Sequence, residues 1–177
     1  MKVTQLLDQY QYGILDFEGV SLHCADLQET NLSRINLTEG DLSDANLEHS
    51  DLSGACLQRA NLTNANLSHA SLVGANLSEV NLIGADLENI DLKGADLSGA
   101  DLRCANLRNA DLCSANLTDV NLNGADLTHA DLTGAKLAGT DISVAETKGA
   151  NINQANWDES ERKQEHTSHH WVSWSGQ

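Results

Sequence analysis

The chain contains no proline, and aromatic residues make up only 3% of its 177 positions. No Phe, Tyr or Trp lies between Phe17 and Trp157. An ordinary globular core is hard to fill from such a composition, because aromatic side chains bury the largest areas. Whatever core this chain forms must therefore consist of Leu and Ala arranged in layers.

Long apolar runs are also missing, since none approaches the ~20 residues that a membrane-spanning helix requires. The first five residues, MKVTQ, lack the charged region and apolar run of a secretory signal. The cysteines show no CxxC spacing, so the sequence indicates neither a zinc site nor a disulfide framework. They are Cys24, Cys56, Cys104 and Cys113. We expect a cytoplasmic protein with reduced thiols.

Basic residues are scarce, with 10 Lys and Arg against 26 Asp and Glu, and the formal net charge is −16. This acidity argues against nucleic acid or an anionic membrane as a partner, because the phosphates would be repelled. It favours solubility, or the basic surface of a partner protein.

One five-residue phrase fills the chain from Leu15 to Trp157. Residues 96–110, for example, read DLSGA, DLRCA and NLRNA. The central apolar residue recurs at every fifth position, which gives 29 phrases without an insertion or deletion. All 24 centres from Leu22 to Leu137 are Leu. A small residue, mostly Ala, stands two positions before each centre, and Asp or Asn stands one position before it almost throughout.

A period of five matches neither the 3.6 residues of a helical turn nor the two-residue alternation of a strand. A sustained short period instead indicates a solenoid, in which each turn contacts only its neighbours. Leu and Ala would point inward, whereas Asp or Asn and the two residues after Leu would face water. Many phrases carry Gly or Asn two residues after Leu, as at Gly54 and Asn64, and these residues suit the positive φ of a type II turn. Each phrase would then be a short straight side that ends in a corner.

The pattern A(D/N)LXX, as in residues 85–89 (ADLEN), resembles the pentapeptide repeat proteins. The resemblance covers about four-fifths of the chain. It is closest in kind to cyanobacterial members, which often begin with a short helix and a phrase like residues 13–17 (GILDF). The resemblance implies an all-β solenoid, a right-handed quadrilateral β-helix, in which four phrases make one square coil of 20 residues. The phrases would make about seven coils, and a spacing of about 4.8 Å gives a rod about 34 Å long.

The two ends require caps, because a solenoid terminus exposes unpaired backbone and open core. Residues 1–14 carry apolar side chains at helical spacing from Val3 to Tyr10, and Gly13 can end the helix. We expect an N-terminal capping helix. Binding of this helix to a membrane surface is the alternative, although the segment is short and poorly charged.

Residues 15–157 are expected to form the β-helix, with Thr147 replacing one centre and Trp157 plugging the open end. Residues 158–177 are polar and are expected to be a disordered tail, whose His166, His169 and His170 could bind a metal adventitiously. The core is predicted from the centres Phe17, Leu22, Leu27, Leu47, Leu67, Leu87, Leu107, Leu127 and Trp157.

Residues 20 apart should stack in columns along the rod. Glu39, Arg59 and Glu79 then alternate in charge, and Glu88 lies below Arg108. A further column stacks like charges at Asp91, Asp111 and Asp131. Such a column indicates either a surface kept for a partner or, more simply, carboxylates that cap local backbone amides.

No catalytic constellation is visible, and we expect no enzyme activity, no cofactor and no metal. His49 and His69 are neighbours in one column, but Asn89 comes next and completes no metal site. Cys104 and Cys113 fall on opposite sides, so they should not form a disulfide. No nucleophile stands with a base, and no phosphate loop is present.

The first functional hypothesis is a structural or adaptor protein that presents flat, rigid faces to another protein. A ridge nearly free of side chains on the least acidic side would allow close approach. It comprises Gly54, Gly74, Gly94 and Gly134. The simpler interpretation is that these glycines only satisfy the corner geometry.

The alternative is that the rod mimics DNA, as some members of this family do when they inhibit DNA gyrase or protect it from quinolones. Duplex DNA carries about 20 charges over about 34 Å, which is close to the net charge of this rod. The acidic surface would comprise Glu39, Glu79, Asp86, Glu88, Asp96, Asp119 and Asp126. The gyrase-binding members dimerise through an apolar C-terminal segment, which this chain lacks. We expect a monomer with an unknown protein partner, and neither nucleic acid nor membrane as a partner.

Overall fold

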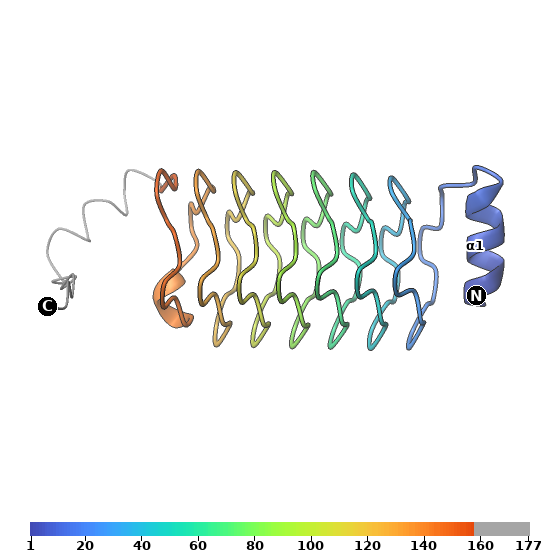
Figure 1. Cartoon of the computed structure of the whole chain (residues 1–177), viewed down its shortest axis with the longest axis horizontal. Helices are drawn as coiled ribbons and strands as arrows, with labels where there is room; N and C mark the ends of the chain where they lie inside the picture. The colour runs from blue at the N-terminus through green and yellow to red at the C-terminus, as the bar shows by residue number, and fades with distance from the viewer. Residues whose placement is uncertain (158–177) are drawn as a thin grey trace, which may run out of the picture.

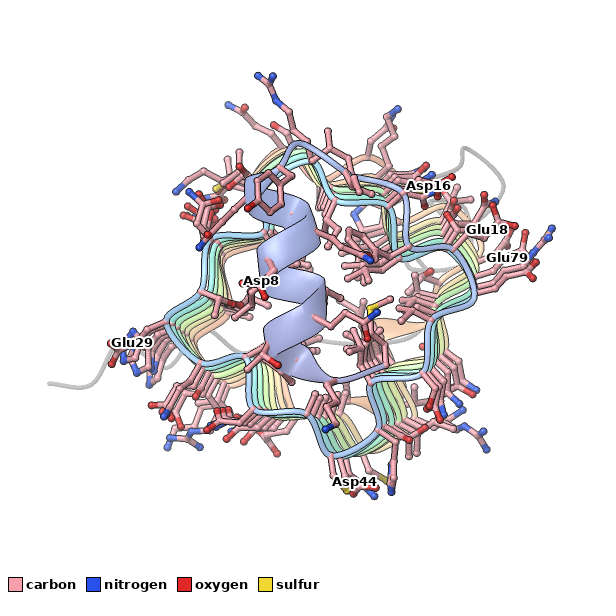
Figure 2. The ribbon with its side chains drawn as sticks, turned by 90° about the vertical axis from the view of Figure 1, so that its right-hand side faces the viewer. Asp8, Asp16, Glu18, Glu29, Asp44 and Glu79 are labelled. Carbon is pink, nitrogen blue, oxygen red and sulfur yellow. The ribbon has the colours of Figure 1, made fainter. Side chains whose placement is uncertain are left out.

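The computed structural model describes residues 1–157, which wind into a stack of coils with a helix across one end (Figure 1). Successive coils pair through parallel β-bridges between residues 20 apart, as at Asp86 and Asn106. This register places four phrases in each coil and gives the rod a four-sided outline when it is seen end-on (Figure 2). Each side makes a single-residue bridge, and within residues 1–157 no longer strand forms, because two residues of every phrase are used by a corner. The count of about seven coils stays a prediction.

The phrase 86–90 shows how every backbone amide is satisfied. The amides of Asp86, Leu87 and Asn89 donate to carbonyl groups of neighbouring coils, at Ala65, Asn106 and Arg108, over 2.7 to 2.9 Å. The Ile90 amide closes the turn on the Leu87 carbonyl at 3.2 Å. The remaining amide, that of Glu88, donates to Oδ1 of Asp86 at 3.1 Å. Asp or Asn before Leu therefore supplies the acceptor that the backbone lacks.

The core is a continuous column of Leu and Ala. Every Leu centre from Leu22 to Leu137 is at most 3% exposed, and Phe17 is 5% exposed. This arrangement fills the interior between Phe17 and Trp157 without aromatic residues, because each layer repeats the one before it. Burying each Leu stabilises the fold by roughly 1.5–3 kcal/mol.

Helix α1, Val3–Gln11, covers the N-terminal end of this core (Figures 1 and 2). Leu6 is fully buried, and the Tyr10 hydroxyl donates to the Ser33 carbonyl at 2.9 Å. The helix is shorter than the segment 1–14 expected to form the cap. Within residues 1–157, no helix combines the length and apolar character needed to cross a membrane.

The C-terminal end is covered less completely than expected. Trp157 packs against the core but is only partly buried, and Ile152 is 44% exposed. Trp157 is therefore not the complete plug that the sequence suggested. The expected tail and its histidines lie outside the described residues.

The ladder also breaks once, at the short 3₁₀ helix η1, Ile142–Val144. Thr140 takes the position usually held by Ala, and its buried hydroxyl donates to the Leu117 carbonyl and accepts from the Val120 amide. The bridge that would join residues 121 and 141 is missing from this described stretch, and regular pairing resumes when the Leu127 amide donates to Glu146. The Thr140 hydroxyl thus takes the place of a backbone group in the ladder, and the phrase that follows it forms η1 in place of a regular side.

The corners accept more residue types than expected. Among residues 1–157, seventeen residues other than Gly have a positive φ, including Glu79 at 58° and His49 at 57°. Their amides bond to the next coil, as when Glu79 donates to Ser98 at 2.8 Å. The coil-to-coil ladder therefore holds ordinary residues in the left-handed region, which costs about 1–2 kcal/mol each.

Substitution of Gly74 by Ala should lower the free energy of unfolding by about 1 kcal/mol. Its φ is 64° and no atom would lie within 4 Å of the added Cβ, so the effect isolates the backbone conformation. The reverse change, Ser114→Gly in the same column, should stabilise by a similar amount. Urea unfolding followed by circular dichroism measures both. Equal midpoints for the wild type and both variants would contradict this account of the corners.

Candidate interaction surfaces

The four walls of the rod are formed by the residues that follow each Leu, whose side chains project outward on every side (Figure 2). The expected alternating column is present. Arg59 lies between Glu39 and Glu79, with nitrogen–oxygen distances of 3.5 and 3.0 Å. All three side chains are more than half exposed, so each pair contributes only about 0–1 kcal/mol.

The expected stacking of Glu88 below Arg108 does not produce an ion pair. Arg108 instead contacts Oδ2 of Asp126, in the next coil, at 3.2 Å. Lys93 pairs with Asp111 of the next coil in the same way, and their contact is 2.7 Å. The residue after Leu therefore meets the residue before Leu in the next coil, so charges on these walls pair diagonally.

The column of like charges has a local explanation. Oδ1 of Asp91, Asp111 and Asp131 each accepts from the amide two residues later, at 3.1, 3.2 and 2.9 Å. Lys93 also contacts both Asp91 and Asp111, which reduces their repulsion. These contacts favour the interpretation of this column as backbone caps.

Cys113 stands between two of these carboxylates. Burial and the neighbouring Asp111 and Asp131 raise the pKa of the Cys113 thiol to about 11. The thiol is therefore protonated near neutral pH, which disfavours a role as a nucleophile. All four cysteines are free, including Cys104 and Cys113.

The proposed acidic surface is partly neutralised by these contacts. Glu39 and Glu79 share Arg59, and Asp126 binds Arg108. Asp86 and Asp96 each accept hydrogen bonds from a local backbone amide and from an Asn side chain of the next coil. Of the two remaining members, Glu88 is half-buried and Asp119 is exposed. Several of these acids therefore already have a structural role.

The glycine ridge is exposed at Gly54, Gly74 and Gly94 and half-buried at Gly134. Gly54, Gly74, Gly94 and Gly134 all have φ between 63° and 69°. At Gly74 and Gly94, an added Cβ would find no atom within 4 Å. Ser114 interrupts the strip, and the neighbouring Val73 is 39% exposed. A flat partner could approach the backbone closely here.

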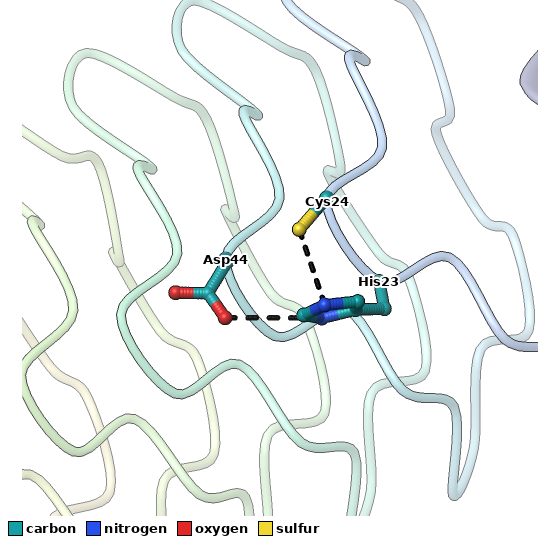
Figure 3. A group of neighbouring side chains, drawn as sticks. All are labelled: His23, Cys24 and Asp44. Atoms are coloured by element: carbon teal, nitrogen blue, oxygen red, sulfur yellow. Dashed lines mark hydrogen bonds and ion pairs between the residues drawn. The ribbon is translucent and has the colours of Figure 1, made fainter.

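Two clusters of histidine differ in their neighbours. His49 and His69 stack with ring centroids 4.7 Å apart and an interplanar angle of 16°. In the described part of the chain, only His23, Cys24 and Asp44 form a three-residue group with metal-ligating atoms close together (Figure 3). The repeat pattern does not indicate this group, although Cys24 and Asp44 are separated by one full coil and are hence neighbours in one column.

Asp131 provides a test of the capping role. The Thr133 hydroxyl, followed by the Thr133 amide, lowers the pKa of Asp131 below its ordinary value of 3.8. Its charged form therefore stabilises the fold above about pH 4, and this contribution is lost as the pH falls through the lowered pKa. Asp131→Ala removes the acceptor and should cost about 1 kcal/mol at pH 7.

Asp131→Asn keeps Oδ1 and should remain near the stability of the wild type, as Asn does in many equivalent phrases. Urea unfolding at pH 7 and pH 3 measures all three proteins. The deficit of the Ala variant should shrink at pH 3. Equal losses for Ala and Asn at pH 7 would show that charge, and not capping, determines the residue at this position.

Comparison with known proteins places the fold among repeat proteins. A family model of pentapeptide repeats matches the chain in eight copies, over residues 15–39, 40–78, 55–94, 81–119 and 100–143. No curated protein sequence matches the chain.

Several solved structures are similar. HetL, a pentapeptide repeat protein involved in heterocyst differentiation regulation in the cyanobacterium Nostoc sp. strain PCC 7120, is 25% identical over 88% of this chain and 94% of HetL, with a TM-score of 0.37. Rfr23 from the cyanobacterium Cyanothece 51142 is 27% identical over 87% of this chain and 99% of its own, with a TM-score of 0.35. QnrB1, a plasmid-mediated fluoroquinolone resistance protein, is 14% identical over 84% and 94% of the two chains, with a TM-score of 0.44.

The assignment rests on the matched repeats, which span most of the chain, and on their agreement with the 20-residue register of the coils. Proteins of this kind are right-handed quadrilateral β-helices. The chain belongs to the pentapeptide repeat family.

Proposed function

We propose that this protein is a non-enzymatic scaffold or adaptor, which presents one wall of a rigid rod to a partner protein. The observation that carries the proposal is the backbone strip of Gly54, Gly74, Gly94 and Gly134, which is exposed at the first three glycines. At Gly74 and Gly94, no atom would contact an added Cβ. Such a strip allows a partner to come within van der Waals distance of the backbone over several coils.

Rigidity supports this role. Each coil bonds to its neighbours on all four sides over nearly the whole length, and the core is packed throughout. A surface that is already ordered loses little conformational entropy when it binds. The family in general consists of structural and interaction proteins.

The chemistry of the ridge indicates the kind of partner. This wall has the smallest excess of acidic residues, and its Lys93 is engaged by Asp91 and Asp111. Val73 adds an exposed apolar contact beside Gly74. A flat, uncharged protein surface suits this wall better than nucleic acid or an anionic membrane. We place the protein in the cytoplasm as a monomer.

A matched pair of substitutions tests the ridge. Gly94→Arg places a long side chain on it, whereas Gly99→Arg places the same side chain on another wall at a corner of similar φ, 63° against 69°. Partners cross-linked to the purified rod in extracts of its source organism are identified by mass spectrometry. Gly94→Arg should lose at least ten-fold in capture of the specific partner, and Gly99→Arg should keep it.

Equal capture by both variants would remove the ridge as the binding surface. Circular dichroism establishes that the two variants are equally folded, since the backbone cost of a side chain is the same at both corners. Sedimentation at micromolar concentration should give a monomer, and a stable dimer would contradict that part of the proposal.

DNA mimicry is the second candidate, and the observation that favours it is the net charge of −16. The structure supplies another reason for many of these acids, because their carboxylates accept from backbone amides or pair with Arg59 and Arg108. A gyrase supercoiling assay, with and without a quinolone and at two salt concentrations, separates the candidates. Salt-sensitive inhibition or protection at low micromolar protein would favour mimicry, and no effect would favour the scaffold.

A further inference from the structure

His23, Cys24 and Asp44 bring three different metal-ligating groups to one point on the wall (Figure 3). Nε2 of His23 lies 3.2 Å from the Cys24 sulfur, and Nδ1 lies 3.8 Å from Oδ2 of Asp44. One ligand atom from each residue lies within 4.8 Å of the other two.

The fold itself creates this proximity. Cys24 and Asp44 both occupy corners, each with φ of 55°, and they are separated by one full coil. Their side chains therefore leave the wall side by side. His23 precedes Cys24, and it leans toward the next coil, where its ring meets Ser43.

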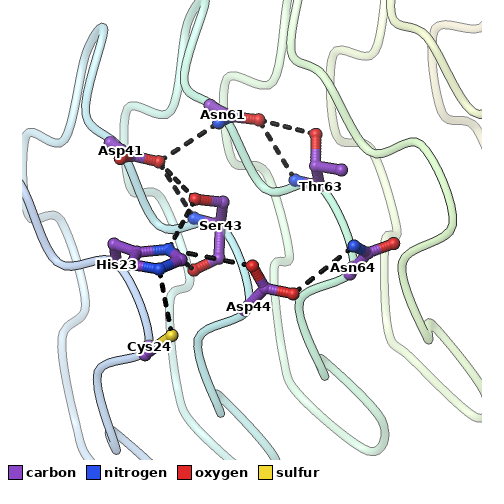
Figure 4. A network of polar contacts seen from close by, with 8 residues as sticks. All are labelled: His23, Cys24, Asp41, Ser43, Asp44, Asn61, Thr63 and Asn64. Carbon is purple, nitrogen blue, oxygen red and sulfur yellow. Dashed lines mark hydrogen bonds and ion pairs between the residues drawn. The ribbon is translucent and has the colours of Figure 1, made fainter.

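The hydrogen bonds around the group fix the histidine tautomer (Figure 4). Nδ1 lies 3.0 Å from the Ser43 carbonyl, which can only accept, so Nδ1 carries the proton. The Ser43 hydroxyl, 2.9 Å from Nδ1, also accepts from it and donates onward to Asp41 at 2.7 Å. Nε2 therefore presents its lone pair toward Cys24, which is the arrangement that metal-binding histidines adopt when the other nitrogen is held by a carbonyl.

The carboxylate is oriented as well. Asn64 donates to Oδ1 of Asp44 at 3.4 Å, while Oδ2 is the oxygen nearer His23. The side chains of His23 and Asp44 are 54% and 48% exposed, so an ion can reach the group from solvent. The ligands are thus open on the outer side, and water could complete the coordination.

From this geometry we propose that His23, Cys24 and Asp44 bind a divalent zinc-type cation. Nitrogen, sulfur and carboxylate oxygen together match the ligand preference of Zn²⁺ and not that of Mg²⁺ or Ca²⁺. Zinc–sulfur and zinc–nitrogen bonds of ordinary length place the two ligand atoms about 3.6 Å apart in a tetrahedral site. The observed separation of 3.2 Å needs only a small opening of the His23 and Cys24 side chains. The 3.8 Å contact of Asp44 is with Nδ1, so its exposed side chain must also swing toward the Nε2 side of the ring to join the metal. Binding releases the Cys24 thiol proton to water and leaves the thiolate on the metal.

Two other groups on the rod serve as internal comparisons. Cys104 occupies an equivalent corner with φ of 57°, but Arg103 precedes it and Gly124 follows one coil later. It therefore has neither an imidazole nor a carboxylate in the positions that His23 and Asp44 occupy. His49 and His69 stack on each other without a thiol between them.

Co²⁺ titration of the reduced, intact protein tests the site, because Co²⁺ replaces Zn²⁺ and gives a thiolate charge-transfer absorption. We expect a saturable band at one equivalent, which Zn²⁺ abolishes by competition. Histidines elsewhere in the chain bind Co²⁺ without producing a thiolate band, so they do not confuse the readout.

Three variants decide the assignment. Cys24→Ser should abolish the band, Asp44→Asn should weaken Co²⁺ binding about ten-fold, and Cys104→Ser should leave both unchanged. Ser and Asn already occupy equivalent corners at Ser114 and Asn64, so the variants should fold. Circular dichroism checks this directly.

The proposal is overturned if no thiolate band appears, or if Cys24→Ser leaves the band intact. It is also overturned if Cys24 reacts faster than Cys104 with an alkylating reagent but gives no band, since His23 would then activate a thiol without holding a metal.

Discussion

Each five-residue phrase contains one backbone amide that the coil-to-coil ladder cannot satisfy, and the structure depends on how that amide is capped. In most described phrases, the side chain of Asp or Asn one residue before Leu accepts from it, as Asp86 does from Glu88. Both oxygen-bearing side chains serve equally, because the cap uses Oδ1, which each possesses. The repeat therefore fixes the shape of this residue and leaves its charge free to vary.

This freedom bears on what the acidity means. An Asn placed above an Asp donates to its carboxylate, as Asn106 does to Asp86 at 2.9 Å, so mixed columns stabilise themselves. Columns of Asp alone lack this donor, and Lys93 contacts both Asp91 and Asp111 in its place. Much of the negative charge thus belongs to carboxylates that cap backbone amides. A binding surface is more reasonably sought at positions without a side chain, such as the glycine ridge.

The five-residue period, together with the four-sided coil that the family resemblance implies, predicts which residues stack along the rod, because only one register is then possible. The 20-residue pairing, the buried Leu centres and the Glu39–Arg59–Glu79 column all follow from it. It predicts contacts between columns poorly. Arg108 contacts Asp126 and not Glu88, because its side chain extends from the column of residues that follow Leu to the column of residues that precede Leu. The five-residue period does not specify this side-chain direction. The break at η1 was missed because Thr140 resembles a small residue in the pattern but carries a hydroxyl that competes for backbone.

Contacts between neighbouring columns also explain how a flat wall can bring reactive groups together. A convex rod offers no cleft, so such groups must meet either within one column or between two neighbouring columns. Stacking along a column brings His49 against His69, which places two identical ligands in contact. A contact between columns brings His23 against Ser43, which fixes the tautomer of the imidazole. Cys24 and Asp44 lie side by side next to it, so an imidazole, a thiol and a carboxylate come together. Because the described corners accept Cys, His and acidic residues as well as Gly, a solenoid of this kind can gain such a group by single substitutions without disturbing its core. The position of the group along the rod is then set by the register alone.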